Sequence, residues 1–340
     1  MKKIFLLLIA GLASMANAQE KDPYLSKTLT GQKIENVKVE TSGGSITVTG
    51  GSMQDSKVEV FVRANNNSDL SKEEIKKRLQ EDYDLNVSVN GNQLVATAKP
   101  NNRNNFNWKR SLNISFKIQV PQHVSTNLNT SGGSIKLDNL SGNQNFSTSG
   151  GSLDLARLSG EVEGQTSGGS IKISNSKNEI RLSTSGGSIN ANNCEGNLKL
   201  ETSGGSLHLS NLKGRIYAAT SGGSIRGADI SGELKTHTSG GNIVLNKMAC
   251  SLETSTSGGN IDVELSEMGK YVKIENSGGN VDLTLPKTGL TLNIRGRIKT
   301  EALSNFSGSM KENELKGKLN GGGVPVDVDS GGGRVALNLQ

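Results

Sequence analysis

The chain has 340 residues, a formal net charge of +6 at pH 7 and only 3% aromatic residues. Its Lys and Arg residues are spread along the sequence without a basic run that could follow a phosphate backbone, so nucleic acid is not an expected partner. Glycine and apolar residues together reach the ~45% typical of globular chains, so the chain can bury a core, though one with few aromatic side chains.

The first residues are typical of a secretory signal peptide. Lys2 and Lys3 precede an apolar stretch, and Ala16-Asn17-Ala18 is an A-x-A cleavage site. We therefore expect residues 1–18 to be removed and residues 19–33 to form a linker. No apolar segment is long enough to span a membrane as a helix, so the exported chain is expected in the periplasm, on the outer cell surface or outside the cell.

Residues 34–128 are expected to contain a first repeat coil and an N-terminal capping segment of strands with one short helix. Ser71 and Glu74 form a capping box that predicts a helix from there to about Gln80. Asn90-Gly91 is a strong hairpin signal. Alternating or apolar runs predict strands over residues 57–64, 85–89, 94–98 and 112–120. Such a segment would cover the open end of a sheet, whose unpaired edge otherwise invites fibre growth.

The dominant feature of the sequence is a repeat of Thr-Ser-Gly-Gly-Ser-Ile. Its copies begin every eighteen residues, at Thr130, Thr148, Thr166, Thr184, Thr202, Thr220, Thr238 and Thr256. An early copy begins at Thr41, and degenerate copies lie at Asn276 and Asp329. A short unit at a fixed period predicts an all-β fold, a parallel β-solenoid with 18-residue coils. We assign residues 129–285 to the regular array and residues 286–340 to irregular C-terminal coils and a second cap.

Within each unit, numbered from its Thr as zero, apolar residues occupy positions five, seven, ten, fourteen and sixteen. This period of two predicts two strands per coil with one buried face each. Gly-Gly at positions two and three, and Gly at twelve, predict corners where glycine reaches positive φ. We expect the Thr hydroxyls to point inward and bond to one another as a ladder. We also expect the Phe146 ring to lie over Gly164 of the next coil.

These turns carry a family resemblance. The repeated Ser-Gly-Gly-Ser-Ile units, with the lead-in Ile118-Gln119-Val120-Pro121 before Thr130-Ser131-Gly132-Gly133, resemble the bacterial "putative adhesin" β-strand-repeat family over roughly residues 34–340. The resemblance implies an exported, right-handed β-solenoid and suggests adhesion. That family is itself a domain of unknown function, so it implies no catalytic residues.

Several chemistries associated with solenoids do not fit the repeat. Calcium-binding β-rolls need a repeating Asp in the turn, which is absent here. Ice binding needs outward rows of Thr, but the column before the repeated Thr is mostly apolar. Polysaccharide lyases and hydrolases need carboxylates in a walled groove, and the coils from Thr130 to Thr256 contain no insertion that could build a wall. His123, His208 and His237 are too scattered for a metal site. We expect no catalytic residue, cofactor or metal.

One polar segment carries residues that can grip a sugar or an acidic polymer. Between Asn101 and Arg110 lie the basic and aromatic side chains of Arg103, Phe106, Trp108, Lys109 and Arg110, which we take as possible ligand contacts. The alternative is a hairpin loop whose Trp packs on the cap.

The two cysteines, Cys194 and Cys250, lie about three coils apart. At ~4.8 Å per coil they are ~14 Å from each other, too far for a disulfide. We expect two free thiols. Cys194 falls in the core column, whereas Cys250 stands at a corner and could form an intermolecular disulfide if it were exposed.

Together these features predict an exported, non-enzymatic scaffold of the cell envelope or surface, whose partner is a surface polymer, a glycan or an envelope protein. Two alternatives remain open: a periplasmic structural or regulatory protein with one protein partner, and a polysaccharide-active enzyme.

Overall fold

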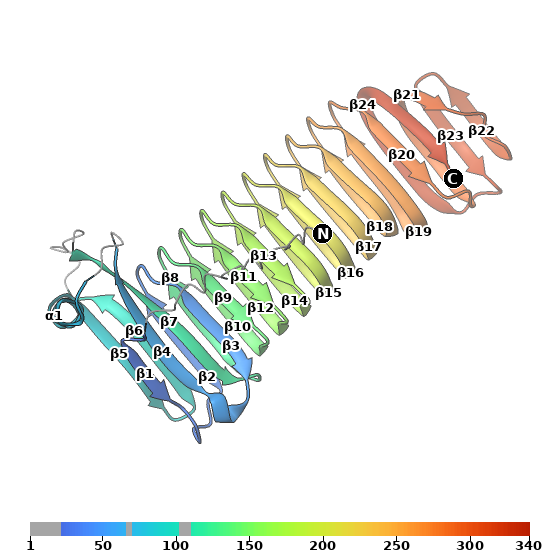
Figure 1. The fold of residues 1–340 in the computed structure, drawn as a ribbon. Coiled ribbons are helices and arrows are strands. Elements are labelled where there is room, and N and C mark those ends of the chain that lie inside the picture. Colours follow the sequence, from blue (N-terminus) through green and yellow to red (C-terminus); the bar gives the residue numbers. More distant parts are fainter. Residues whose placement is uncertain (1–21, 66–69, 102–109) are drawn as a thin grey trace, which may run out of the picture.

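The computed structural model describes residues 22–65, 70–101 and 110–340. The chain forms a parallel β-solenoid in which successive coils stack along a rod (Figure 1). Every described strand belongs to one continuous hydrogen-bonded sheet that winds around the rod. The expected fold class is confirmed, including the small α+β segment at the N-terminal end. The expected signal peptide, residues 1–18, lies outside the described residues.

Each regular coil supplies two strands, or one long strand that bends between them. In chain order the strands are β8 (Ser125–Thr130), β9 (Ile135–Asp138), β10 (Ser141–Thr148), β11 (Leu153–Ala156), β12 (Ser159–Thr166), β13 (Ile171–Ser174), β14 (Lys177–Thr184), β15 (Ile189–Thr202), β16 (Leu207–Thr220), β17 (Ile225–Thr238), β18 (Ile243–Thr256) and β19 (Ile261–Asn276). Each pairs in parallel with the strand one coil away, and from β8 to β18 the partners are eighteen residues apart, as between Ile171 and Ile189. The period in the sequence is therefore the register of the sheet.

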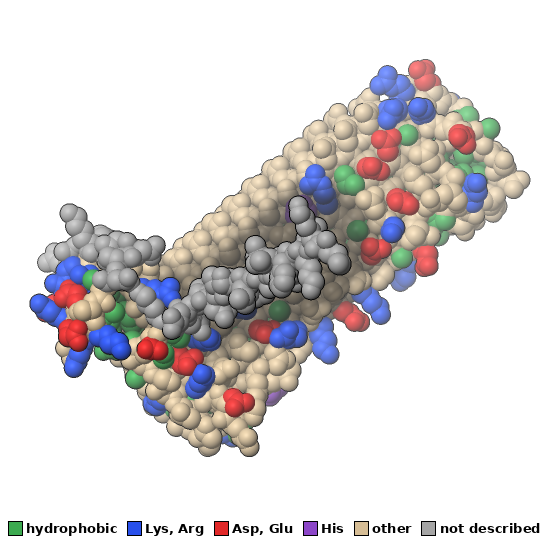
Figure 2. Space-filling view, in the orientation of Figure 1, with side chains coloured by type: hydrophobic (Ala, Val, Ile, Leu, Met, Phe, Trp, Pro, Cys, Tyr) green, Lys and Arg blue, Asp and Glu red, His purple; other side chains and the backbone are tan. Residues whose placement is uncertain are grey.

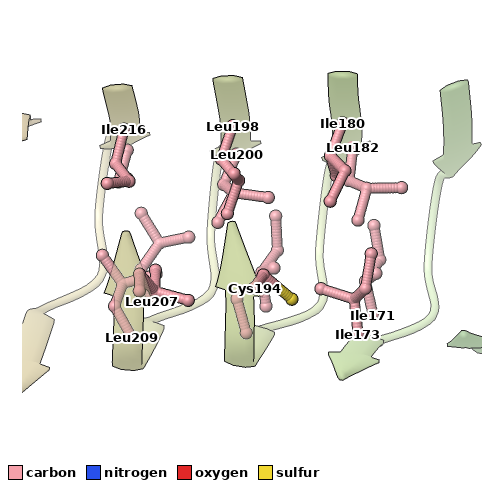
Figure 3. Close-up of a cluster of buried hydrophobic side chains, with 14 of the residues drawn as sticks. Ile171, Ile173, Ile180, Leu182, Cys194, Leu198, Leu200, Leu207, Leu209 and Ile216 are labelled. Atoms are coloured by element: carbon pink, nitrogen blue, oxygen red, sulfur yellow. The ribbon is translucent and has the colours of Figure 1, made fainter. Parts of the chain in front are cut away.

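The core is made by the expected apolar columns. Figure 3 shows Ile171 and Ile173 on one strand of a coil pointing toward Ile180 and Leu182 on its other strand. The Leu and Ile residues at positions five and fourteen are buried throughout the array. Phe146 and Gly164 are register partners, and a Cβ on Gly164 would lie 2.1 Å from the Phe146 ring. The expected stacking of the Phe146 ring over Gly164 is confirmed.

The Gly-Gly corners need glycine for a different reason than the expected positive φ. Neither glycine of the regular pairs has positive φ. Instead the second glycine lies directly above the corner of the preceding coil, so that a Cβ on Gly187 would stand 2.0 Å from the carbonyl oxygen of Gly169. A Cβ on the first glycine, Gly186, would have its nearest neighbour at 3.5 Å, which is ordinary contact. Glycine is required at position three by the closeness of two backbones.

The second corner does use positive φ, and at two positions. Glycine at position twelve has φ between 105° and 123°, as in Gly160 and Gly196, and this expectation is confirmed. The sequence analysis missed position nine, where non-glycine residues adopt φ between 51° and 57°: Asn139, Arg157, Asn175, Asn193, Asn211, Asp229 and Lys247. Asn and Asp enter this left-handed region more readily than other side chains, and their recurrence at position nine was the available signal.

The repeated Thr side chains point inward, as expected, but in the part of the chain that the structure describes each bonds to backbone and not to another Thr of its column. Thr202 is representative: its hydroxyl donates to the carbonyl of Gly187 in the preceding coil at 2.7 Å and accepts the amide of Gly205 at 3.2 Å. The same pair of bonds recurs from Thr148 to Thr256. The mutual hydroxyl ladder is therefore wrong for this column, since each Thr ties its own corner to the one before it.

The N-terminal end of the rod is built out of chain order. Its elements are β1 (Leu25–Thr28), β2 (Asn36–Thr41), β3 (Ile46–Gly51), the 3-10 turn η1 (Met53–Asp55), β4 (Lys57–Ala64), α1 (Lys72–Asp82), β5 (Tyr83–Asn90), β6 (Gln93–Pro100) and β7 (Leu112–Pro121). The early coil formed by β2 and β3 is inserted between β6 and β7 on one side and β8 and β9 on the other. Antiparallel β4 and β5 then cover β7 and β6, and β1 pairs with β4.

Two expectations concern this end, the start of the helix and the linker over residues 19–33. The helix begins where the capping box predicts, because the Ser71 hydroxyl accepts the Glu74 amide at 3.2 Å. The linker expected over residues 19–33 is wrong for residues 25–29. Residues 25–28 form β1, and Leu29 is fully buried, since the antiparallel edge of β4 offers a free row of backbone groups to pair with.

The C-terminal end repeats the same device. Its strands are β20 (Val281–Leu285), β21 (Leu290–Thr300), β22 (Phe306–Lys311), β23 (Glu314–Leu319) and β24 (Val324–Leu339). After β20 the chain leaves one coil position vacant and forms β21 in the position beyond it. It then turns through the antiparallel β22–β23 hairpin and returns as β24. β24 then fills the vacant coil between β19 and β20 on one side and β21 on the other.

Both cysteines are free and buried, so the expectation of two free thiols is confirmed. Cys250 is only 1% exposed although it replaces the corner glycine, and the register between β18 and β19 shifts beside it. Burial raises the pKa of the Cys250 thiol to about 12. An intermolecular disulfide at Cys250 is not available to the folded chain.

Candidate binding surface

The Ser-Gly-Gly-Ser corners form one long edge of the rod. They are the row of short loops along the upper edge of Figure 1, and Figure 2 shows this edge as backbone and uncharged polar side chains, without the charged groups gathered elsewhere. Each corner carries a serine before the Gly-Gly pair and a serine or an asparagine after it. The two serine rows have different surroundings, and that difference defines the candidate surface.

The side chains at position four form hydrogen bonds between adjacent coils. The Ser188 hydroxyl accepts the backbone amide of Ser206 in the next coil at 3.1 Å, and Ser206 does the same for Ser224 at 3.3 Å. Asn242 and Asn260 continue the pattern with their side-chain oxygens. These side chains bind adjacent coils together by accepting the amide of the next coil.

The row at position one is free. Ten exposed serines make it up, which we call the outer serine row: Ser42, Ser131, Ser149, Ser167, Ser185, Ser203, Ser221, Ser239, Ser257 and Ser277. No side-chain hydroxyl of this row bonds to any other residue that the structure describes, although their backbone groups join neighbouring corners, as Gly186 N–H does to Ser167 at 2.9 Å. The row therefore offers donors and acceptors at intervals of one strand spacing, ~4.8 Å.

A shallow groove of about 590 Å³ runs along the outer serine row. Its floor is the buried Thr column and its other wall is position seventeen, where the residues vary: Ser147, Gln165, Ser183, Glu201, Ala219 and His237. The groove spans the coils from Thr130 to Ser239. It is long, open and almost entirely polar, which suits an extended ligand lying along the rod.

The corner amides are not available to an anion. The position-three amide bonds to the Thr hydroxyl, the position-two amide to the preceding serine carbonyl, and the position-four amide to a side-chain oxygen, as in the corner that contains Gly205. A backbone nest needs free N–H groups. At positions two to four of this corner, the backbone amides are therefore already bonded, and the donors that remain are side-chain hydroxyls.

A second hollow, of about 230 Å³, adjoins the groove on the same face of the sheet. Two carboxylates line it, Glu163 and Glu201, with Arg181 and Lys199 between them. The two Glu residues are two coils apart, ~10 Å along the rod, which exceeds the separation used by glycosidases. Lys199 also engages Glu201 at 2.9 Å. No loop of the described array rises beside this hollow to exclude water.

Of the expected ligand contacts, only Arg110 falls within the described residues. Its guanidinium lies 2.6 Å from Glu81 and 3.3 Å from Asp82, and these carboxylates raise the pKa of Arg110. Acidic residues at the C-terminal end of α1 oppose the helix dipole, so Arg110 stabilises the helix end. Arg103, Phe106, Trp108 and Lys109 lie outside the described residues.

The histidines do not come together. His123 contacts Ser141 at 3.1 Å, and His237 contacts Ser255 at 2.9 Å in a different part of the array. In the described part of the chain, no group of three or more His, Cys, Asp or Glu is placed to hold a metal ion. Nor does any described helix have the length and apolar character needed to cross a bilayer.

Comparison with known proteins agrees with the fold. Residues 178–338 match the family described as Toastrack DUF4097, a little under half of the chain, and the resemblance expected from the turns is confirmed. Among solved structures, the chain is similar to a "putative cell adhesion protein" from Clostridium sporogenes ATCC 15579 at 11% identity, covering 93% of this chain and 98% of that chain. The TM-score is 0.21, so the two do not superpose as whole molecules. No curated protein matches.

The outer serine row was not singled out from the sequence, although a signal for it was present. Within the array, outward positions drift freely: position six holds Lys136, Asp154, Lys172 and Asn190 in successive coils. Position one is Ser in every copy from Thr41 to Asn276. An exposed position that keeps the same residue in every copy, although its side chain makes no hydrogen bond within the described chain, is a candidate for binding.

Proposed function

We propose that this protein is an exported, non-enzymatic scaffold of the cell envelope or cell surface that binds an extended polymer, a glycan above all, along the outer serine row. The observation that supports this most directly is the contrast between the two serine rows, of which one is used by the fold and the other is free. Polyhydroxylated chains offer matching donors and acceptors along their length.

Repetition of the serine along the row supplies the binding affinity that a single serine cannot. One hydrogen bond adds only about 0.5–1.5 kcal/mol net, so an isolated hydroxyl would bind weakly. A rigid row of hydroxyls meets successive units of a polymer that is already held, which raises their effective concentration. Affinity should therefore increase steeply with the length of the ligand.

The test compares two triple variants with the same change in composition. Ser167, Ser185 and Ser203 of the outer row are changed together to Ala, and so are Ser170, Ser188 and Ser206 of the position-four row. Binding is measured on an array of linear polysaccharides and peptidoglycan fragments. The outer-row variant should lose binding and keep its stability, whereas the position-four variant should lose stability and keep binding when folded. Equal binding by the outer-row variant and the unchanged protein would refute the proposal.

Location decides between this function and its first alternative, a periplasmic structural or regulatory protein with one protein partner. Intact cells are labelled with a membrane-impermeant amine reagent. Modification on intact cells supports the surface scaffold. Modification only after the outer membrane is opened rules out adhesion and directs attention to a periplasmic partner.

The second hollow motivates the other alternative, a polysaccharide-active enzyme. Glu163 and Glu201 are the two carboxylates of this hollow. We expect no release of reducing ends from linear polysaccharides by the unchanged protein. Release that is abolished by Glu163→Gln would favour the enzyme over the scaffold.

We further propose the segment that contains Trp108 as a second contact with the ligand, together with Phe106, Arg103, Lys109 and Arg110. Its support is the sequence, where the chain's one Trp stands among basic residues. Trp108→Ala should reduce polysaccharide binding and leave thermal unfolding unchanged. A large loss of stability would instead assign this Trp to the packing of the cap.

A further inference from the structure

The C-terminal end of the array brings together basic residues that are distant in the sequence. Arg297 in β21 and Arg334 in β24 are direct register partners, because β24 returns to lie between β20 and β21. Lys299 follows two residues later on β21, on the same face as Arg297 by the alternation of a strand. The side-chain oxygen of Asn280, the residue before β20, accepts the backbone amide of Arg334 at 3.0 Å.

These four residues and Ile298 line a pocket of about 480 Å³. Among the described residues, Arg297 and Lys299 have no ion-pair partner, whereas Arg334 pairs with Asp282 at 3.2 Å. Three cationic side chains therefore face one carboxylate, and the pocket keeps a net positive charge. Like charges directly opposite each other on paired strands are unfavourable, so this arrangement needs a compensating group.

Donors that lack a partner are present in the pocket. The Nε atom of Arg334 is buried without a hydrogen-bond partner in the described chain. The Oδ1 of Asn280 is held by the Arg334 amide, which leaves its Nδ2 group free to donate. Guanidinium groups bind carboxylates and phosphates through paired N–H bonds, and Arg297 is exposed and unengaged.

We propose that this pocket binds an oxyanion, a carboxylate or a phosphate carried by an envelope polymer, between Arg297 and Arg334. The anion would neutralise the two facing guanidinium groups and accept bonds from Arg334 Nε and Asn280 Nδ2. The site is independent of the outer serine row, which has no charged donors, so either can fail without the other.

The test is titration calorimetry with two probes, inorganic phosphate and a short oligogalacturonate. Arg297→Gln should weaken binding by about tenfold and reduce its salt dependence, since it removes one charged donor without breaking an ion pair. The matched control is Arg295→Gln on the same strand, whose side chain already pairs with Asp329 at 3.7 Å. It should bind as the unchanged protein does, and circular dichroism should show both variants folded.

Tighter binding of phosphate would assign the site to phosphate-bearing polymers, and tighter binding of oligogalacturonate would assign it to uronic-acid polymers. Both results support the proposal. Absence of binding by the unchanged protein to either probe, or an equal loss of affinity in Arg297→Gln and Arg295→Gln, would overturn it.

Discussion

The two glycines of one corner allow a sharp test of how the coils stack. Gly186 and Gly187 are adjacent, and neither has positive φ. Yet a Cβ would meet a carbonyl oxygen at 3.5 Å on the first and at 2.0 Å on the second. The same substitution to Ala should therefore have opposite effects at two neighbouring positions.

The magnitudes follow from these distances. Gly186→Ala adds a methyl group in ordinary contact and reduces the freedom of the unfolded chain, so it should stabilise by about 0.4–1 kcal/mol. In Gly187→Ala the neighbour is backbone and cannot rotate away. The two coils must separate by more than 1 Å, which weakens the bond from the Thr184 hydroxyl to the Gly169 carbonyl and the adjoining ladder. We expect a loss of about 3 kcal/mol, at the upper end of overpacking costs.

The assay is urea unfolding followed by circular dichroism, with amide hydrogen exchange to locate the change. Gly187→Ala should expose the amides of its own corner and of the two neighbouring coils to faster exchange, because each coil contacts only its neighbours. Gly186→Ala is the matched control. Equal stability of the two variants would refute the argument that backbone approach, and not flexibility, requires glycine at position three.

Three further changes probe the core of the rod. Thr202→Val should lower the free energy of unfolding by about 2 kcal/mol, because the Gly187 carbonyl loses a buried donor, and Ser203→Ala beside it serves as the control; an unchanged urea midpoint would contradict this. Gly164→Ala should cost about 2 kcal/mol in the unchanged protein and much less with Phe146→Ala, so additive effects in a double-mutant cycle would deny the ring contact. Cys250 should resist alkylation at about pH 8 until the chain is unfolded in urea. Its thiol pKa is raised from 9.0 to about 12 in the folded state, so its contribution to stability, complete below pH 9, should be lost as the pH rises toward 12, and Cys250→Ser should flatten that part of the pH profile.

Much of the fold could be predicted from the sequence because the repeat is local and periodic. Each coil presents the same apolar positions, and parallel stacking of identical units is the arrangement that buries all of them at once. This is why the eighteen-residue register, the buried columns, the contact of Phe146 with Gly164 and the helix start at Ser71 could be derived without coordinates.

Other features depended on which backbone groups approach each other in space. No periodicity places β2 and β3 inside the N-terminal cap or brings β24 back between β20 and β21, because closing each end satisfies free strand edges with whatever segment can reach them. The partner of each Thr hydroxyl and the reason for glycine at position three likewise follow from distances between coils.

The candidate sites show the same division. The sequence determined that Ser precedes the Gly-Gly pair of every repeated corner and that Ser or Asn follows it, but only the tertiary structure decided that the second row accepts interstrand bonds and the first makes none with its side chains. Arg297 and Arg334 are unremarkable in the sequence. They meet because β24 folds back, and side chains far apart along a chain can form a site only where such a return brings their strands into register.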